Sequence, residues 1–272
     1  MSSLESAVAI LHCFRPDTPE LAVSDVARQL SMPKSTVSRL LRAMGEQGLV
    51  EQDAESRRYR VGLLPFRLGQ LYHAHTKVID LVDAEVEALV NETGFTGYIG
   101  VLNEADIVIL RKRHGRYPVR MVLEPGYRMA AAATAYGKAL LARLPNDEVR
   151  RLLPAAPGNG KSGTRMPIGK LLAALDEVRS RGWAMADEAF PGMCAIGAAV
   201  GSADDQPAVG FSLSFPDNAV DPKLRRTIAD RMVAAAQRVA ARTSDPAILS
   251  DTRHAGGSGA KSRIENQVRA SR

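Results

Sequence analysis

Cysteine is scarce in this chain of 272 residues, which contains only Cys13 and Cys194. Two thiols cannot form the disulfide framework of a small secreted domain, and they share no metal-binding spacing with the five histidines. No apolar run approaches the roughly 20 residues that a transmembrane helix needs, and the N-terminus lacks the features of a secretory signal. We therefore expect a cytoplasmic protein that uses no metal, cofactor or membrane.

Common catalytic motifs are missing as well. Gly137-Lys138 lacks the upstream glycine and the following Ser/Thr of a phosphate-binding loop. The segment 210–214 ends in serine, where a nucleophile elbow requires glycine. Ser31 and Lys34 have Ser-x-x-Lys spacing, but the partner motifs are absent. We expect no catalytic residues, although an enzyme that converts a small metabolite remains an alternative.

Positive charge is distributed unevenly along the chain. The formal net charge is +6 and the pI is about 9.5, yet the first 66 residues contain eight basic and eight acidic residues. Within them, residues 28–44 contain four basic residues and no acidic one, and Arg57, Arg58 and Arg60 form a second basic cluster. Such local asymmetry favours a polyanionic partner more than the net charge does.

The first 63 residues have the pattern of a small helical domain with a hairpin. Apolar spacing predicts helices over 4–14, 24–30 and 33–47. Ser24 is the expected N-cap of the second helix and Gly48 the stop of the third. Two short strands around a polar turn follow, over 49–52 and 57–61. The order predicts a helix-turn-helix with a wing.

The third helix has two chemically different faces. At about 100° per residue, Val37, Leu41 and Met44 fall on one side, and Arg39 and Arg42 fall on the other. This arrangement is typical of a helix that enters the major groove of DNA. Two alternatives are a solvated helix face and a winged helix that binds another protein. The residues predicted to contact double-stranded DNA are Lys34, Ser35, Thr36, Ser38, Arg39, Arg42, Arg57 and Arg58.

The rest of the chain predicts a linker and a larger domain. A helical stretch over 64–92, with a possible break near Thr76, is followed by interleaved strands and helices over 93–246. Residues 247–272 have too few apolar side chains to form a core and are expected to be a disordered tail. The fold class is α+β, with DNA-binding domain 1–63. Strands are predicted over 97–102, 107–112, 119–123, 183–186, 195–200 and 208–215, and helices over 134–144, 147–153, 168–181 and 222–242.

Several segments resemble IclR-type transcriptional regulators, over about residues 4–243. The most specific is 33–41, PKSTVSRLL, and 137–142, GKALLA, supports it. The resemblance implies a winged helix joined by a helix to a mixed α/β effector-binding domain with a mainly antiparallel sheet. It also implies homodimers or tetramers on a pseudo-palindromic operator, whose affinity a small organic acid modulates. Further matching segments are 4–7, 24–27, 48–50, 59–62, 125–126 and 182–183.

The resemblance also places an effector pocket in the second domain. Ser212 and Ser214 share one strand face, so both hydroxyls can meet a ligand carboxylate, although bonds to neighbouring backbone are the alternative. Ala195 stands where the family pattern has cysteine, and Tyr136 brings an aromatic ring where the pattern has a small residue. These departures favour an aromatic or larger carboxylate over a glyoxylate-like one. The predicted effector-binding residues are Ala135, Tyr136, Asp187, Cys194, Ala195, Ser212 and Ser214.

Overall fold

The structure is a computed structural model that describes residues 2–74, 77–117, 123–153, 166–187, 190–201 and 207–248. The chain divides into two compact units, residues 1–77 and 78–272. Within the described ranges, no helix has both the length and the apolar character needed to cross a membrane. The predicted break near Thr76, most of the predicted strand over 119–123 and the tail from 249 onward lie outside these ranges.

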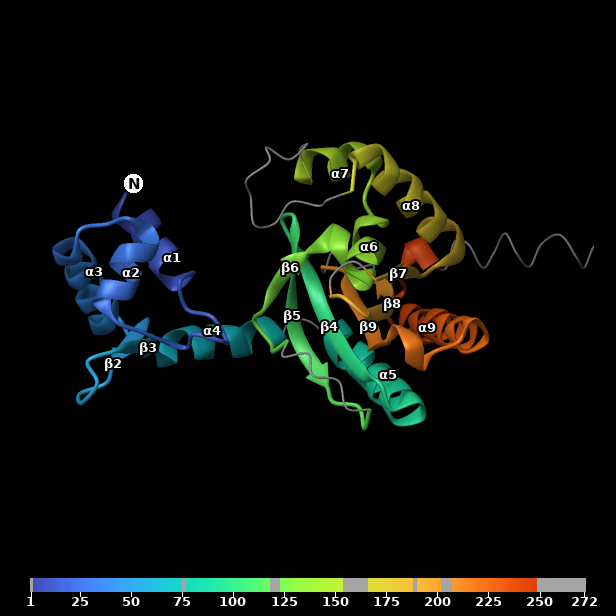
Figure 1. The fold of residues 1–272 in the computed structure, drawn as a ribbon, viewed down its shortest axis with the longest axis horizontal. Helices are drawn as coiled ribbons and strands as arrows, with labels where there is room; N and C mark the ends of the chain where they lie inside the picture. The colour runs from blue at the N-terminus through green and yellow to red at the C-terminus, as the bar shows by residue number, and fades with distance from the viewer. Residues whose placement is uncertain are drawn as a thin grey trace, which may run out of the picture. The chain divides into compact units, whose positions relative to one another are not determined.

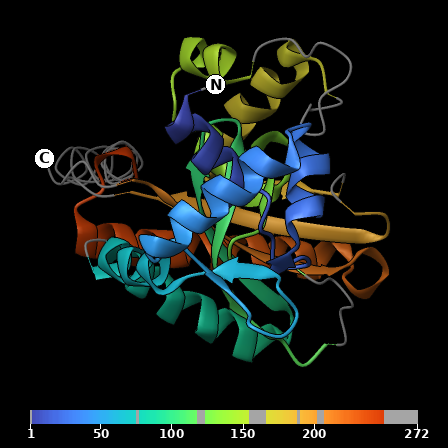
Figure 2. The same ribbon diagram turned by 90° about the vertical axis from the view of Figure 1, so that its left-hand side faces the viewer.

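The first unit is a winged helix-turn-helix, as predicted (Figure 1). Its first three helices pack on a core that includes Ile10, Val26, Val37 and Leu41. The small antiparallel sheet has the order β1-β3-β2, and Figure 2 shows its β2–β3 hairpin in cyan below the blue helices. The elements are α1 (Ser3–Leu11), β1 (Glu20–Leu21), α2 (Val23–Leu30), α3 (Lys34–Glu46), β2 (Val50–Gln52), β3 (Tyr59–Val61) and α4 (Leu63–Ala74).

Helix α2 begins at Val23, one residue before the predicted range, and the expected N-cap at Ser24 is wrong. Ala22 occupies the N-cap, and its backbone N–H donates to the carboxylate of Asp25 at 3.1 Å. Because this carboxylate sits at the third helical position, it satisfies a backbone donor that would otherwise be unpaired. The helix ends at Ser31, whose φ of 53° is left-handed and starts the tight turn into α3.

The described part of the second unit contains one six-stranded sheet in the order β6-β5-β4-β9-β8-β7. Every neighbouring pair is antiparallel, which confirms the predicted mainly antiparallel sheet. The strands are β4 (Thr96–Asn103), β5 (Asp106–Arg113), β6 (Arg128–Ala130), β7 (Ala184–Ala186), β8 (Met193–Val200) and β9 (Val209–Pro216). The helices are α5 (Lys77–Thr93), α6 (Ala135–Leu141), α7 (Asn146–Leu152), α8 (Ile168–Arg181) and α9 (Pro222–Thr243), with 3₁₀ turns at Ala131–Ala133 and Asp217–Ala219.

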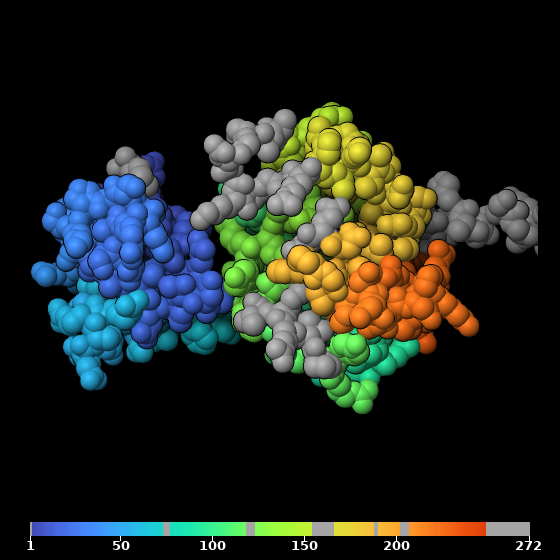
Figure 3. All heavy atoms as spheres, viewed as in Figure 1, coloured from blue at the N-terminus to red at the C-terminus, as the bar shows by residue number. Residues whose placement is uncertain are grey.

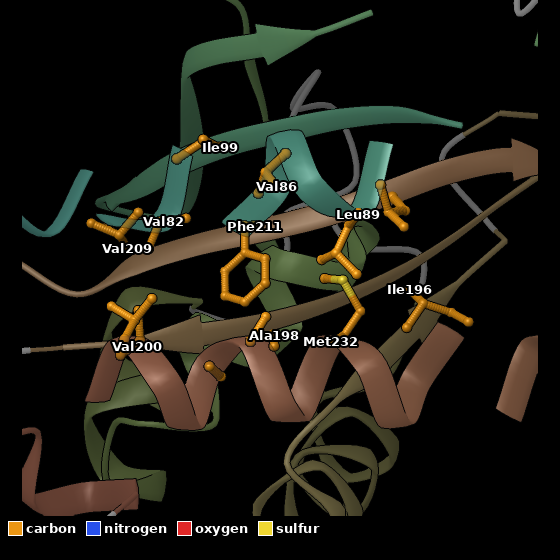
Figure 4. Packing of buried hydrophobic residues seen from close by; sticks show 14 of the residues in the cluster. Val82, Val86, Leu89, Ile99, Ile196, Ala198, Val200, Val209, Phe211 and Met232 are labelled. Carbon is orange, nitrogen blue, oxygen red and sulfur yellow. The ribbon is translucent and has the colours of Figure 1, made fainter. Parts of the chain in front are cut away.

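The two faces of this sheet are covered by different helices (Figure 1). Helices α5 and α9 pack on one face, where Figure 4 shows Val86, Leu89 and Met232 gathered around Phe211. Helices α6 and α8 pack on the other face with Tyr98. Alternation along the strands separates the faces: Phe211 belongs to the first and Ser212 points to the second.

Glycine lets α6 approach the second face closely. A Cβ atom at Gly197 of β8 would lie 2.6 Å from the backbone nitrogen of Tyr136, and one at Gly100 of β4 would lie 2.9 Å from the Tyr136 ring. Any larger residue would force the helix away from the sheet, since real Cβ contacts are not this short. The start of α6 is therefore held against β4 and β8, beside Ser212.

Candidate functional sites

A groove runs between α3, the β2–β3 turn and the start of α2 in the first unit. It holds about 1,250 Å³, including its part open to solvent. Three cations line it, Lys34, Arg42 and Arg57, and none of its described lining residues is acidic. A concave surface with charge of one sign concentrates ions of the opposite sign. The other lining residues are Ala22, Val23, Ser24, Ser38, Leu41, Gly45, Gln52, Ser56 and Tyr59.

Helix α3 exposes the face that its sequence predicts. Val37 and Leu41 are fully buried, whereas Arg39 and Arg42 are exposed. Lys34 and Ser35 are exposed at the start of the helix, and Thr36 and Ser38 are half-buried. Figure 3 draws the atoms of this unit as blue to cyan spheres. A helix with one packed face and one cationic face is free to enter a nucleic-acid groove.

Most of these cations lack an acidic partner. Among the residues that the structure describes, no carboxylate forms an ion pair with Lys34, Arg39, Arg42 or Arg57. Arg28, by contrast, is paired with Asp25 at 2.7 Å. Cations that are not neutralised within the protein are available for phosphate oxygens or base edges.

Arg58 differs from the other predicted DNA contacts. Its guanidinium donates to the backbone carbonyl of Glu20 at 3.0 Å and to Asp25 at 3.2 Å. The side chain therefore fastens the hairpin to the start of α2. Arg57 beside it adopts a left-handed φ of 57° and remains exposed. The role of Arg58 in DNA binding stays a prediction, and the structure adds a positioning role that the sequence did not indicate.

The second unit contains a cavity of about 400 Å³, including its mouth, between the sheet and the start of α6. Six of the seven predicted effector-binding residues line it. The exception is Asp187, which is exposed beyond the end of β7 and is not part of the wall. The lining residues are Tyr98, Leu123, Met129, Thr134, Ala135, Tyr136, Ala186, Phe190, Met193, Cys194, Ala195, Ser212 and Ser214.

Three buried hydroxyls in this cavity have no hydrogen-bond partner among the described residues: those of Tyr98, Tyr136 and Ser212. Burial, with a smaller effect of Glu124, raises the pKa of Tyr98 to about 12. Burial likewise raises the pKa of Tyr136. Both phenols therefore remain protonated donors at neutral pH. Buried polar groups are normally paired, so three orphans around one cavity indicate a missing acceptor.

The sequence did not single out Tyr98. Its ring reaches the cavity because it lies directly opposite Ser212 in the pairing of β4 with β9. Directly opposed residues of an antiparallel pair share one face of the sheet. The polar–apolar alternation around residue 98 could have indicated this face, but the pairing partner of β4 could not be read from the sequence.

Cys194 and Ala195 face opposite sides of β8. The thiol of Cys194 donates to the Asp217 carboxylate at 3.2 Å and belongs to the core under α5 and α9. Burial, followed by the Asp217 contact, raises the pKa of this thiol to about 11, so it is not an activated nucleophile. Among the described residues, no three His, Cys, Asp or Glu side chains could hold one metal ion.

A winged helix with a cationic groove, in one chain with a cavity-bearing α+β unit, defines the class of two-domain DNA-binding regulators. The IclR helix-turn-helix domain matches residues 3–54, and the IclR C-terminal domain of bacterial transcriptional regulators matches residues 70–241. The chain belongs to the IclR family of transcriptional regulators.

Relatives with names and structures agree with this family. The chain is 32% identical to the HTH-type transcriptional regulator KdgR of Escherichia coli, over 72% of this chain and 76% of KdgR. An IclR-family regulator from Brucella abortus shares the fold, with a TM-score of 0.70, 22% identity and coverage of 89% and 92% of the two chains. An IclR homologue from Microbacterium hydrocarbonoxydans, solved with 4-hydroxybenzoate, gives a TM-score of 0.68, 19% identity and coverage of 87% and 100%.

Proposed function

We propose that this regulator binds a double-stranded DNA operator with α3 and that a small carboxylate in the second unit changes its affinity for that operator. The three unpartnered hydroxyls of the cavity carry the proposal, because a carboxylate supplies the acceptors they need. The ligand can change operator affinity only if it binds the DNA-binding conformation and the other conformation of the protein with different affinities. The coupling free energy between two such sites is typically about 1–3 kcal/mol. No catalytic step is involved.

The proposed DNA contacts divide by chemistry. Arg39 and Arg42 carry planar donor forks that fit guanine O6 and N7. Lys34 and Ser35, at the N-terminus of α3, suit a phosphate together with the free backbone N–H groups there. Arg57 in the turn of the wing suits a neighbouring backbone. Thr36, Ser38 and Arg58 complete the proposed set.

The proposed effector is an aromatic or larger carboxylate. Tyr98, Tyr136 and Phe190 give the cavity aromatic walls, which contact a ring better than a short aliphatic acid. The solved homologue with 4-hydroxybenzoate supports this class as a starting point. Ala195 leaves room where a larger side chain would fill the wall.

Gel-shift titration tests the proposed function directly. The full chain is titrated onto its own upstream DNA at graded salt, with and without benzoate, 4-hydroxybenzoate and short aliphatic acids. We expect specific, salt-sensitive binding that at least one aromatic acid shifts severalfold. Absence of DNA binding would favour the protein-binding winged helix, and conversion of an acid into a product would favour an enzyme.

Removing a hydroxyl from the cavity should weaken binding of the effector. We expect Ser212→Ala and Tyr136→Phe each to lower the affinity for the active acid about five- to tenfold, because each deletes one hydrogen bond of about 1 kcal/mol. DNA affinity without ligand should not change. Calorimetric titration measures the loss of affinity. Tyr117→Phe is the control, because it removes the phenolic hydroxyl of a tyrosine that is 41% exposed. Equal affinities in all variants would contradict the proposed pocket.

The protein is proposed to form homodimers or tetramers through its first unit. Helix α4 exposes Leu63, Phe66, Leu68 and Leu71 to between 54% and 61%, and α1 exposes Leu4 to 74%. A helix that is apolar on most sides is stable in water only when another surface covers it. A second copy is the favoured occupant, since two recognition helices match the two half-sites of a palindromic operator.

Charge on α4 should disrupt this assembly. We expect Phe66→Glu combined with Leu71→Glu to convert the oligomer into monomers, because burying two carboxylates in an apolar interface costs several kcal/mol. Light scattering after size-exclusion chromatography measures the mass. Leu224→Glu on α9, at a position 39% exposed, should leave it unchanged. A wild-type monomer at all concentrations would rule out the proposed interface.

A further inference from the structure

A lysine and a glutamate form an ion pair beside the effector cavity. Lys112 Nζ of β5 lies 2.8 Å from Glu124 Oε1. Lys112 is directly opposite Tyr98 in the pairing of β5 with β4, and Glu124 follows Leu123; both Tyr98 and Leu123 line the cavity. Neither Lys112 nor Glu124 lines the cavity itself, so the pair lies next to the part of the wall that Tyr98 and Leu123 form.

The neighbours of Lys112 point to the other face of the sheet. Arg111 donates to Asp83 of α5 at 2.6 Å, and Arg113 donates to the same carboxylate at 2.7 Å. Since side chains alternate along a strand, Lys112 projects to the face of Tyr98 and α6. The arginines hold β5 on α5, which leaves Lys112 as the cation on the cavity side of this segment.

The two partners differ in their access to water. The side chain of Lys112 is 7% exposed, whereas that of Glu124 is 43% exposed. A buried ammonium needs an anionic partner, because an uncompensated buried charge is strongly unfavourable. Glu124 can turn into solvent at little cost, but Lys112 cannot. Another anion can thus replace Glu124 as the partner of Lys112, while Lys112 stays in place.

We propose that Lys112 binds the effector's carboxylate and that Glu124 occupies this cation as an internal competitor in the ligand-free protein. The inference rests on the proposed effector function of the cavity. An entering carboxylate supplies the same charge as Glu124 and also accepts from the Tyr98 hydroxyl, which Glu124 leaves unpartnered. Glu124 is released toward water. The cavity therefore selects anions over neutral molecules of the same shape.

Two substitutions with opposite expected effects test the exchange. Calorimetric titration of the full chain uses benzoate, 4-hydroxybenzoate and their primary amides. Glu124→Gln removes the competitor and should tighten binding of the acids by about tenfold or more, and Lys112→Met should weaken it by at least as much. Binding of the amides should change little in either variant. Glu104→Gln, which neutralises a carboxylate 83% exposed in its contact with Arg128, is the matched control.

The outcomes separate this inference from the proposed function. Suppose that the wild-type protein binds the acids and that Glu124→Gln binds them no more tightly. Only the proposed exchange is then overturned, because competition by Glu124 predicts tighter binding in this variant, whereas a purely structural ion pair predicts weaker binding. If neither wild type nor Glu124→Gln binds any acid, both proposals fail. Glu124→Gln keeps the test valid even if Lys112→Met does not fold, and its circular dichroism should match that of the wild type.

Discussion

Replacing Arg42 by alanine should weaken operator binding by about 1–3 kcal/mol, or roughly 5- to 150-fold, if its guanidinium reads a base. Arg42 is exposed in the groove between α3 and the wing. Arg39→Ala should have a similar effect, and both should change the preferred sequence at the contacted position. Competition gel shifts with single-base variants of the operator measure the two effects together.

Salt dependence distinguishes base contacts from phosphate contacts. Lys34→Ala and Arg57→Ala should weaken binding to all sequences alike and reduce the slope of log affinity against log salt by about one unit each. Arg226→Ala is the matched control, since Arg226 is a 73%-exposed arginine of the second unit with a surface partner, Asp230. Unchanged binding in the four groove and α3 variants would refute the proposed docking of α3.

Asp245→Ala should destabilise the second unit by about 3–5 kcal/mol, because it leaves a partly buried guanidinium without its anion. Asp245 is fully buried, and Arg143 donates to it at 2.8 Å. The backbone N–H of Gly201 donates to the same carboxylate at 2.6 Å, and that of Ala247 at 3.1 Å. One side chain thus joins the segments that directly follow α6, β8 and α9. The urea-unfolding transition of the second unit measures the loss in its free energy of unfolding.

The stabilising effect of Asp245 should disappear in acid. Burial acts to raise the pKa of this carboxyl, but the bonds from Arg143 and Gly201 outweigh it, so its pKa is below the ordinary value. A lowered pKa means that the contribution is fully present above the unfolded value of about 3.9 and is lost as the pH falls through the folded pKa. The stability difference between wild type and Asp245→Ala should therefore be constant between about pH 5 and 8 and shrink below about pH 4.

A surface carboxylate provides the comparison for this experiment. Asp230 is 63% exposed in its pair with Arg226, and pairs of this kind contribute roughly 0–1 kcal/mol. Asp230→Ala should accordingly shift the urea midpoint little at any pH. A loss for Asp245→Ala no greater than for Asp230→Ala would show that the buried carboxylate does not hold these segments together.

Long periodic elements could be predicted from the sequence, and so could the hairpin strands β2 and β3 around a polar turn, but other short strands such as β1 and β6 could not. Helix α3 was found with its buried and exposed faces because its amphipathic pattern spans three turns. Strand β1 has two residues and β6 has three, which is too short for alternation to show. The N-cap of α2 was misassigned because Ser24 is a good capping residue by type. The backbone geometry, which the sequence does not show, places the N-cap at Ala22 and puts Asp25 at the third helical position.

The candidate sites show the same division. Local spacing identified Lys34 and Arg42, which the structure brings into one groove. The ion pair of Arg58 with Asp25 joins residues 33 positions apart, and no local pattern indicates it. Tyr98 was missed for a related reason, since its place in the cavity depends on which strand pairs with β4. Asp187 was chosen by resemblance, but the structure leaves it outside the cavity wall.

The bonds that Arg58 forms at the start of α2 affect which DNA shapes the first unit can fit. Because the hairpin is bonded through Glu20 and Asp25 to the helices that also carry α3, we expect the distance between α3 and the hairpin to be fixed before DNA binds. Little ordering entropy then remains to be lost on docking. If α3 and the hairpin dock as proposed, the first unit should discriminate among DNA segments by the width of the groove next to the one that α3 contacts.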